Sequence, residues 1–349
     1  MKIVVLAGGT STEREVSIVS GTGVCKALRS LGHQAILLDV FTGDADADPE
    51  TVFDGEYDVD GAAEKMRALS AFVNEEKETD RVFFGPQVLE ICKAADFVFM
   101  ALHGANGEDG RVQAVLDLYK IRYSGTDYVS SAIAMDKTRT KQIFRASGIP
   151  TPKGKTVFKG HADAKELISE IHPPLIVKPQ CGGSSIGITI CNTAEELEKG
   201  LENSFLYEDA AIVEQFIIGR ELTAAVLGDT VYPVVEIAPK QGFYDYTNKY
   251  EPGMTVETCP AEIPEEKTEE IREIALQAHA ALGIKAYARY DFIMRDYDSK
   301  VYCLEANTLP GMTPTSLVPL EAKTVGIGYP ELCQKLIDLS LQKYGEQTE

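Results

Sequence analysis

The segment YARYDFIMRDYDSKVYCLEAN, residues 287–307, contains two apolar-rich stretches separated by the polar stretch RDYDSK. This pattern predicts two antiparallel strands joined by a hairpin, and residues two apart on a strand face the same side of it. If the pairing is symmetric about the middle of the polar stretch, Asp291 lies opposite Glu305 and Arg289 lies opposite Asn307. Cross-strand neighbours are about 5 Å apart. The hairpin would therefore gather four polar side chains on one face.

Two carboxylates that face each other at this distance repel unless a cation lies between them. Asp291, Glu305 and Asn307 offer oxygen atoms, which are the ligands that Mg²⁺ prefers in proteins. The hairpin therefore predicts a magnesium site. The alternative is a solvated polar face that binds nothing.

A glycine-rich segment, PLIVKPQCGGSSIGI at 174–188, points to phosphate binding. An apolar strand there delivers Lys178 to a Gly-Gly-Ser-Ser turn. Glycines let backbone N–H groups approach phosphate oxygens, and serine hydroxyls add donors. The segment is not a Walker A loop, because no GK[ST] follows and no helix opens. An ordinary turn between two strands is the alternative.

Two further polar segments fit a nucleotide site. In VEQFIIGRE, residues 213–221, Glu214 and Glu221 flank a short link between apolar strands and could accept hydrogen bonds from a base and a ribose. In FYDYTNKY, residues 243–250, three tyrosines and a lysine share one polar loop, which is typical of a lid over a ligand. The alternatives are exposed glutamates at a strand edge and a mobile surface loop.

The N-terminal third alternates strands and helices. Apolar strands are predicted at 3–7, 34–40 and 96–102, and an amphipathic helix at about 15–31 follows the first of them. This order predicts a parallel sheet with helices on both faces, and such sheets bind ligands where their strands end. The acidic stretch 42–64 is interpreted as a surface insertion.

Further along the chain, a helical pattern at 130–147 ends before Pro150 and Pro152. The chain after these prolines is rich in strands. GTGVCK at 21–26 is not a dinucleotide-binding loop, because it lies inside a helical pattern and lacks the final glycine.

Composition narrows the class of protein. The chain has 349 residues, which predicts two or three domains, and a formal net charge of −20, which argues against nucleic acid as a partner. A local group of lysines can still bind an anionic nucleotide. The apolar runs are too short for a membrane helix. Seven scattered cysteines without a CxxC pair indicate reduced thiols in a cytoplasmic protein, and neither a disulfide framework nor a zinc site is predicted.

These segments together resemble the D-alanine:D-alanine ligases of the ATP-grasp superfamily. The resemblance covers nearly the whole chain and rests on the segments GGTSTEREVS, ALHGANGEDG, AMDK, KPQCGGSSIG, VEQFIIGRE, FYDYTNKY, ARYDF and LEANTLPGMTPTSL, in this order. It implies an α/β ATP-grasp fold, in which an N-terminal parallel α/β domain is followed by two α+β domains that clamp ATP. The implied domains are 1–136, with the first D-alanine site, 137–224, and 225–349, with the lid loop and the metal site.

The resemblance also implies a role for each matching residue. ATP would be held by Lys137, Lys178, Ser185, Glu214, Phe216, Ile217, Glu221, Tyr244 and Lys249. Two Mg²⁺ ions, which Mn²⁺ could replace, would be bound by Asp291, Glu305 and Asn307. The first D-alanine would meet Glu13, with His103 nearby, and Glu13, Ser184 and Tyr250 would link this site to the lid. Arg289 and the backbone N–H of Gly311 would form an oxyanion hole. Ser316 and Leu317 would receive the carboxylate of the second D-alanine.

The implied activity is ATP-dependent ligation of two D-alanines through an acyl phosphate, for peptidoglycan synthesis in the cytoplasm. The family further suggests a homodimer that needs neither nucleic acid nor a membrane. Tyr250 and Leu317 resemble the residues of enzymes whose acceptor is D-alanine. A D-alanine:D-serine ligase is the first alternative, and a nucleotide-binding protein without turnover is the second.

Two departures from the family pattern stand out. The stretch 42–95 is longer than in the leanest members, and Cys181 lies inside the glycine-rich loop. Alkylation of Cys181 is expected to weaken ATP binding by wedging this loop open.

Overall fold

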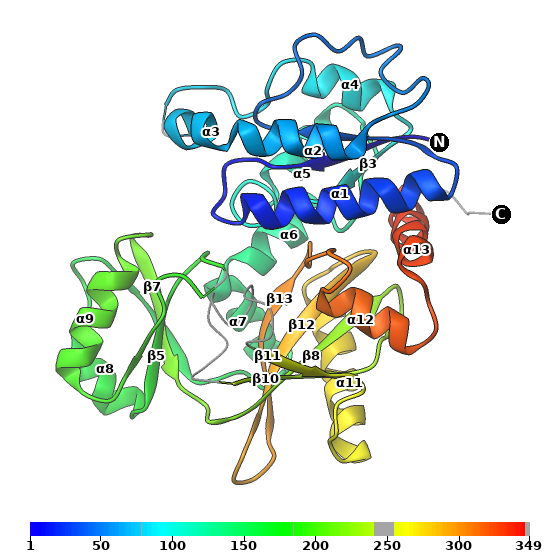
Figure 1. The fold of residues 1–349 in the computed structure, drawn as a ribbon. Helices are drawn as coiled ribbons and strands as arrows, with labels where there is room; N and C mark the ends of the chain where they lie inside the picture. The colour runs from blue at the N-terminus through cyan, green and yellow to red at the C-terminus, as the bar shows by residue number, and fades with distance from the viewer. Residues whose placement is uncertain (78, 184, 241–254, 346–349) are drawn as a thin grey trace.

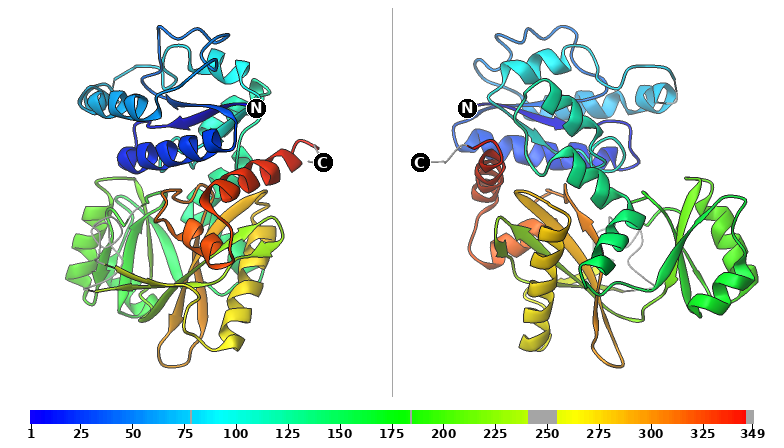
Figure 2. Two further views of the ribbon diagram at one scale, coloured as in Figure 1. Left: turned by 45° about the vertical axis from the view of Figure 1, so that its right-hand side comes forward. Right: turned by 180° about the vertical axis from the view of Figure 1, so that it is seen from behind.

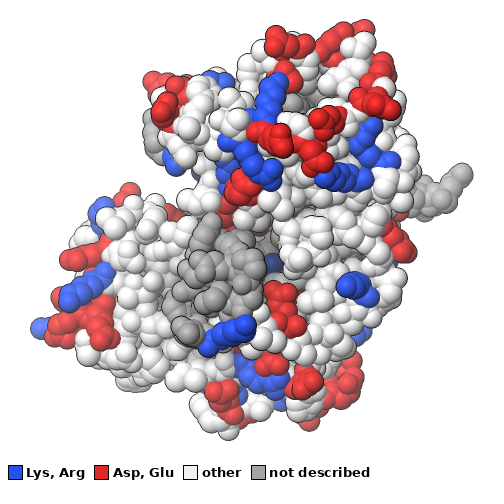
Figure 3. All heavy atoms as spheres, in the orientation of Figure 1, with Lys and Arg blue, Asp and Glu red and all other residues white. Residues whose placement is uncertain are grey.

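A computed structural model describes residues 1–77, 79–183, 185–240 and 255–345. Three separate sheets organise the described chain (Figure 1). None of the helices in these ranges combines the length and the apolar composition that a membrane crossing needs. On the face shown in Figure 3, acidic and basic side chains are interspersed over the N-terminal part and the two parts below it.

The N-terminal part contains a parallel sheet in the order β2-β1-β3. Its strands are β1 (Lys2–Ala7), β2 (Gln34–Asp39) and β3 (Phe97–Met100). Its helices are α1 (Arg14–Ser30), α2 (Val59–Ala68), α3 (Ser70–Glu76), α4 (Val88–Ala94), α5 (Arg111–Leu118) and α6 (Tyr128–Met135). Side chains of β1 alternate between two cores: Ile3 and Val5 pack in one, Val4 and Leu6 in the other. Burial on both faces explains the continuous apolar run of β1, and the predicted parallel α/β organisation is confirmed.

The interpretation of 42–64 as a surface insertion is wrong for part of this stretch. Phe53 is 2% exposed, and Val59 and Ala63 are buried in the core beside α1. The acidic composition hid these residues, because single apolar side chains that recur between charged ones still face the core. The stretch therefore ends in α2, a helix that packs against α1 and β2.

The central part is built on an antiparallel sheet in the order β4-β7-β5-β6. Its strands are β4 (Gly154–Phe158), β5 (Leu175–Pro179), β6 (Thr189–Cys191) and β7 (Ala210–Gln215), and its helices are α8 (Ala164–Ile171) and α9 (Ala194–Ser204). The two helices and one face of the sheet enclose a core of their own, which includes Leu167, Val177 and Leu197.

The helix predicted at 130–147 is two helices, α6 and α7 (Lys137–Ala146). Asp136 separates them, because its extended backbone ends α6 while its side chain accepts a hydrogen bond from the Arg139 N–H at 3.0 Å and caps α7. This break places Lys137 in the first turn of α7.

The C-terminal part contains six strands, five of them in the order β11-β10-β8-β12-β13, with β9 paired to β8. These are β8 (Gly219–Leu227), β9 (Thr230–Val231), β10 (Val235–Pro239), β11 (Thr255–Thr258), β12 (Tyr287–Arg295) and β13 (Val301–Asn307). The helices are α11 (Glu265–Ala281), α12 (Leu317–Thr324) and α13 (Tyr329–Gln342).

Strand β8 joins two cores. Leu222 and Ala224 pack with α11, whereas Ala225 and Leu227 pack in the core that also holds α1 and α13. The last helix, α13, thereby lies against the first, α1, and Figure 2 shows the two side by side. The N-terminal and C-terminal parts are thus held by one shared core.

The predicted pairing of the hairpin is confirmed for the four residues that were predicted to share one face. Asp291 lies opposite Glu305 and Arg289 lies opposite Asn307 across β12 and β13. A β-bulge directly after Asp291 shifts the register by one residue, so the pairs nearer the turn are not symmetric in the way predicted.

Candidate active site

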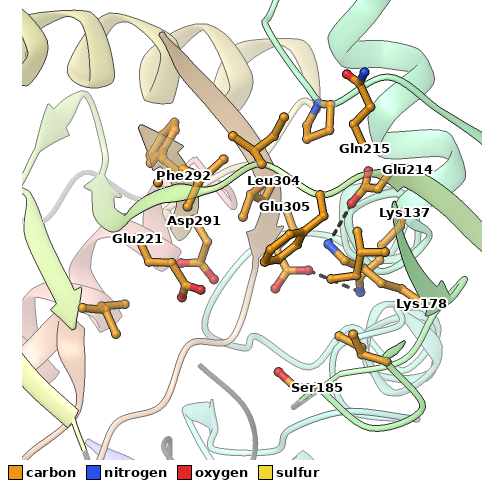
Figure 4. Close-up of a pocket in the computed structure, with 18 of the residues that line it drawn as sticks. Lys137, Lys178, Ser185, Glu214, Gln215, Glu221, Asp291, Phe292, Leu304 and Glu305 are labelled. Atoms are coloured by element: carbon orange, nitrogen blue, oxygen red, sulfur yellow. Dashed lines mark hydrogen bonds and ion pairs between the residues drawn. The ribbon is translucent and has the colours of Figure 1, made fainter. Parts of the chain in front are cut away.

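Two cavities meet where the three parts of the chain come together. The smaller, of about 330 Å³, lies between the central and C-terminal sheets and is drawn in Figure 4. The larger, of about 600 Å³, lies between the C-terminal sheet and the N-terminal part. Lys137, Gly182, Gly183 and Glu305 line both cavities, so this set marks their junction.

Every predicted site residue that the structure describes lines one of the two cavities. The smaller cavity is lined by Lys137, Lys178, Ser185, Glu214, Phe216, Ile217, Glu221, Asp291 and Glu305. The larger cavity is lined by Glu13, His103, Arg289, Asn307, Gly311, Ser316 and Leu317. The remaining predicted residues, Ser184, Tyr244, Lys249 and Tyr250, lie outside the described ranges.

Lys137 ties the glycine-rich loop to the hairpin. Its Nζ donates to the carbonyl of Gly182 at 2.6 Å and lies 3.4 Å from Oε2 of Glu305. Asp136 caps α7 and so makes Lys137 its first helical residue, and Figure 4 shows the Lys137 side chain in the smaller cavity. The ammonium group of Lys137 is therefore held at the place where the two cavities meet.

Glu214 is held by two lysines inside the smaller cavity. Lys178 and Lys141 place their Nζ atoms 2.7 and 2.8 Å from its two carboxylate oxygens (the Lys178 pair is drawn in Figure 4). Burial alone would raise the pKa of Glu214, but the two ammonium groups outweigh it and lower the pKa to about 2. Burial lowers the pKa of Lys141, and Glu214 opposes that shift. Each carboxylate oxygen can accept more than one hydrogen bond, so these ion pairs are compatible with the predicted adenine contact.

Sequence reasoning missed Lys141. Its side chain is buried and also donates to Oγ1 of Thr151 at 3.1 Å. The available indication was its spacing, because Lys141 follows Lys137 by four residues and so lies one turn further on the same face of α7.

Asp291 is the hub of the hairpin. Arg289 donates to its two oxygens at 2.9 and 2.8 Å, Thr223 Oγ1 donates at 2.7 Å, and Asn307 Nδ2 donates at 3.0 Å. With Lys137 beside Glu305, the repulsion between the two carboxylates is offset by cations of the protein itself. Thr223 was not predicted, since it comes from β8, far from the hairpin in sequence.

The donor set of the hairpin fits a divalent cation that prefers oxygen. Asp291, Glu305 and Asn307 supply two carboxylates and an amide group next to one another; Nδ2 of Asn307 faces Asp291, and its Oδ1 would be the atom available to a cation. Across the described ranges, no group of three His, Cys, Asp or Glu side chains offers an alternative site. This set suits Mg²⁺ better than Zn²⁺, which favours nitrogen and sulfur ligands.

His103 supports the wall of the larger cavity. Its Nδ1 lies 3.0 Å from the carbonyl oxygen of Leu309, which can only accept, so Nδ1 carries the proton. Nε2 lies 3.3 Å from Oγ of Ser20, and the same hydroxyl oxygen accepts from the Met312 N–H at 3.3 Å. Burial lowers the pKa of His103. A neutral His103 therefore holds the 309–312 segment in place.

Glu108 is a third residue that was not predicted, although it lies in the segment ALHGANGEDG. It accepts a hydrogen bond from the Gly104 N–H at 2.8 Å and lines the larger cavity. Burial, followed by the negative charge of Glu13, raises the pKa of Glu108 to about 8. At neutral pH a largely protonated Glu108 adds little negative charge beside Glu13, which suits one bound ammonium group.

The start of α12 forms the far wall of the larger cavity. Ser316 is the N-cap and Leu317 is the first helical residue. The first N–H groups of a helix have no partner within the helix and favour an anion such as a carboxylate. A side chain at Gly311 would place its Cβ 3.0 Å from Oγ of Ser316, so glycine keeps this approach open.

Cys181 lies at the edge of the glycine-rich loop. Its backbone N–H donates to the Glu208 carboxylate at 2.9 and 3.0 Å. Burial, with Glu208 and Asp136 close by, raises the pKa of the Cys181 thiol to about 12. The reactive thiolate is therefore disfavoured, and any alkylation at neutral pH is expected to be slow.

Comparisons with known proteins agree with this geometry. The family descriptions D-ala D-ala ligase N-terminus and D-ala D-ala ligase C-terminus match residues 2–126 and 143–338. A D-alanine--D-alanine ligase from Pediococcus pentosaceus is 41% identical, with 100% of both chains covered.

Solved structures give the same result. The D-alanine--D-alanine ligase from Bacillus anthracis complexed with ATP has a TM-score of 0.76 at 29% identity, with 99% of each chain covered. A D-Ala:D-Ser ligase from Enterococcus faecalis has a TM-score of 0.75 at 30% identity, covering 97% of this chain and 99% of its own. The predicted resemblance and the predicted α/β fold are confirmed, and the chain belongs to the D-alanine--D-alanine ligase family.

Proposed function

We propose that the protein joins two D-alanines at the expense of ATP, giving D-alanyl-D-alanine, ADP and phosphate for peptidoglycan synthesis. The observation that carries this proposal is the meeting of the two cavities at Lys137 and Glu305. A nucleotide in the smaller cavity would point its terminal phosphate at an amino acid in the larger one.

The smaller cavity would hold ATP with its base near Phe216 and Ile217 and its ribose near Glu221. Lys137, Lys178 and Ser185 would meet the phosphates. Asp291, Glu305 and Asn307 would hold two Mg²⁺ ions, for which Mn²⁺ could substitute. Bound there, the ions would neutralise charge on the transferred phosphoryl group.

In the first half-reaction, Glu13 would hold the ammonium group of the first D-alanine, and Glu108 would limit the local negative charge. The D-alanine carboxylate would attack the γ-phosphorus, releasing ADP and forming an acyl phosphate. Lys137 would stay beside the oxygens of the moving phosphoryl group and stabilise their charge.

In the second half-reaction, the first turn of α12 at Ser316 and Leu317 would hold the carboxylate of the second D-alanine. Its neutral amine would attack the carbonyl carbon of the acyl phosphate, the bond from this carbon to the phosphate oxygen would break, and the departing phosphate would take up the proton that the nitrogen loses. Arg289 and the Gly311 N–H would stabilise the tetrahedral oxyanion.

Acyl phosphates hydrolyse, so water has to be excluded during the reaction. The predicted lid residues Tyr244, Lys249 and Tyr250, together with Ser184, would serve this purpose.

We further propose that the protein is a homodimer in the cytoplasm. A measurement of molar mass by light scattering would test the dimer.

The predicted end of the central ATP-grasp domain, residue 224, lies inside β8, which belongs to the C-terminal sheet. We therefore place the end of the central domain before Gly219. The N-terminal domain would keep the predicted range 1–136.

Ligation of D-alanine to D-serine is the second candidate function, because a D-Ala:D-Ser ligase has a similar structure. Leu317 at the start of α12 favours D-alanine. A nucleotide-binding protein without turnover would have no need of Arg289 and Gly311 beside a second cavity.

The test is phosphate release with ATP and Mg²⁺, with products identified by mass. We expect rapid release and the D-alanine dipeptide when D-alanine is the sole amino acid. A need for D-serine, with a mixed product, would contradict the acceptor assignment alone. Absence of release with any D-amino acid would contradict the ligase function.

A further inference from the structure

Glu321 is a buried carboxyl group that the reaction above does not use. It lies in α12, is 0% exposed, and its Oε2 accepts a hydrogen bond from the backbone N–H of Ala225 at 2.8 Å. Its Oε1 has no hydrogen-bond partner among the residues that the structure describes. A half-satisfied buried carboxyl group is unusual enough to call for an explanation.

The hydrogen bond connects two walls of the larger cavity. Glu321 follows Leu317 by four residues and so lies one helical turn behind the part of α12 that lines the cavity. Ala225 lies opposite Arg289 in the ladder between β8 and β12, and Arg289 lines the same cavity. Beside the apolar packing of Leu317 and Val318, this is a polar contact that holds the start of α12 relative to the strand next to Arg289.

The pairing of β8 with its neighbouring strands explains why the Ala225 N–H needs a hydrogen-bond acceptor from outside the sheet. β10 pairs with residues 221–223 of β8 and β9 pairs with Val226 and Leu227, whereas the Ala225 N–H meets neither strand. A buried N–H without a partner is costly, and the carboxyl oxygen of Glu321 satisfies it.

We propose that Glu321 is a positioning residue for the acceptor amino acid, a tether that holds the first turn of α12 at a fixed place relative to Arg289. The proposal rests on the proposed function, in which these two elements contact the second D-alanine and its oxyanion. Loss of the tether is therefore expected to weaken acceptor binding while nucleotide binding remains.

Burial raises the pKa of Glu321 well above its ordinary value; the hydrogen bond from the Ala225 N–H and the charge of Arg289 oppose this shift, and the charge of Asp291 adds to it. Cys259 and Tyr232 are the other titratable groups close to it.

The test compares Glu321→Gln with Glu321→Leu. Glutamine keeps the size and an acceptor oxygen for the Ala225 N–H, whereas leucine removes the acceptor. We expect Glu321→Leu to raise the acceptor KM about tenfold, which is the effect of losing one well-placed hydrogen bond, with the KM for ATP unchanged within about twofold. Glu321→Gln should stay within about twofold of the wild type in both constants.

Leu332→Ala is the matched control. Leu332 is also fully buried, in the core beneath α12, and lines neither cavity. It should lower the thermal midpoint and leave the acceptor KM as it is. The proposal is overturned if Glu321→Leu behaves like this control, or if it raises both KM values equally.

A wild-type protein without turnover would contradict the proposed function rather than this proposal. Calorimetric binding of D-alanyl-D-alanine would then replace the acceptor KM. Binding that is weaker for Glu321→Leu than for Glu321→Gln supports the tether, and equal binding overturns it.

Discussion

Lys141 shares the Glu214 carboxylate with Lys178 and thereby adds to the positive charge at the smaller cavity, where ATP is proposed to bind. The two ammonium groups and one carboxylate together carry a net positive charge. Without Lys141, Glu214 would neutralise Lys178 alone, and less positive charge would face the phosphates. Lys141→Met is therefore expected to raise the KM for ATP roughly tenfold, with little change in the KM for D-alanine.

Steady-state titration of ATP at saturating D-alanine measures this effect. Lys155→Met is the control, because the Lys155–Glu170 ion pair is exposed and lies away from both cavities. An unchanged KM for ATP in Lys141→Met would show that Lys141 does not contribute to phosphate binding.

At the scale of residues, local pattern predicted much of the site. Asp291 and Glu305 followed from strand alternation, and Lys178 followed from its place before a glycine turn. Lys141 and Thr223 were missed because their partners, Glu214 and Asp291, lie on elements far away in the sequence, and such contacts are made only by folding. Glu108 was missed because its shifted pKa depends on burial beside Glu13.

At the scale of elements, His279 adds a polar contact between α11 and β12 to the apolar core that the two elements share. Its Nδ1 lies 3.0 Å from the hydroxyl of Tyr290, the neighbour of Arg289 on β12. Burial lowers the pKa of His279 to about 4, against a weak opposing effect of Asp229. The folded protein therefore binds fewer protons than the unfolded chain between pH 6.5 and 4.

The contribution of neutral His279 to the free energy of unfolding is thus fully present above pH 6.5. As the pH falls toward 4, the free energy of unfolding decreases by on the order of 3 kcal/mol on account of this group. Urea unfolding at pH 7 and at pH 4.5 measures it. His279→Gln should have a lower free energy of unfolding than the wild type at pH 7. The difference in free energy of unfolding between the two proteins should be smaller at pH 4.5. A constant difference at both pH values would contradict this role of His279.

Elements were predicted well where one periodicity held over the whole segment. The apolar run of β1 and the hairpin of β12 and β13 are such cases. The split between α6 and α7 was missed, although Asp136 is a favoured N-cap residue, because the helical pattern continues on both sides of it. The burial of Phe53 was missed because acidic neighbours dominate that stretch.

At the scale of the whole molecule, the sequence predicted the order of the parts but not which of them share a core. The N-terminal and C-terminal parts are joined because α13 packs on α1 and because β8 has apolar side chains on both faces. Such long-range packing leaves no periodic trace in the sequence. The central sheet keeps a core of its own.

This separation predicts how the molecule responds to nucleotide. The smaller cavity lies between the central sheet, which supplies Lys178 and Glu214, and the C-terminal sheet, which supplies Asp291 and Glu305. A non-hydrolysable ATP analogue with Mg²⁺ should therefore tie the central sheet to the rest. At a hundredfold excess over its dissociation constant, it should stabilise the central sheet against opening by about 2.7 kcal/mol.

Amide hydrogen exchange followed by mass spectrometry measures this response strand by strand. We expect the largest gain in protection in β5 and β7, a smaller gain in β12 and β13, and little change in β1 to β3, whose core is already shared with α13. Chelation of the metal should remove most of the gain, because the analogue would then lose its link to Asp291 and Glu305. Equal protection of all three sheets would mean that the molecule opens as one unit, and the central sheet would then not be the part that nucleotide fixes in place.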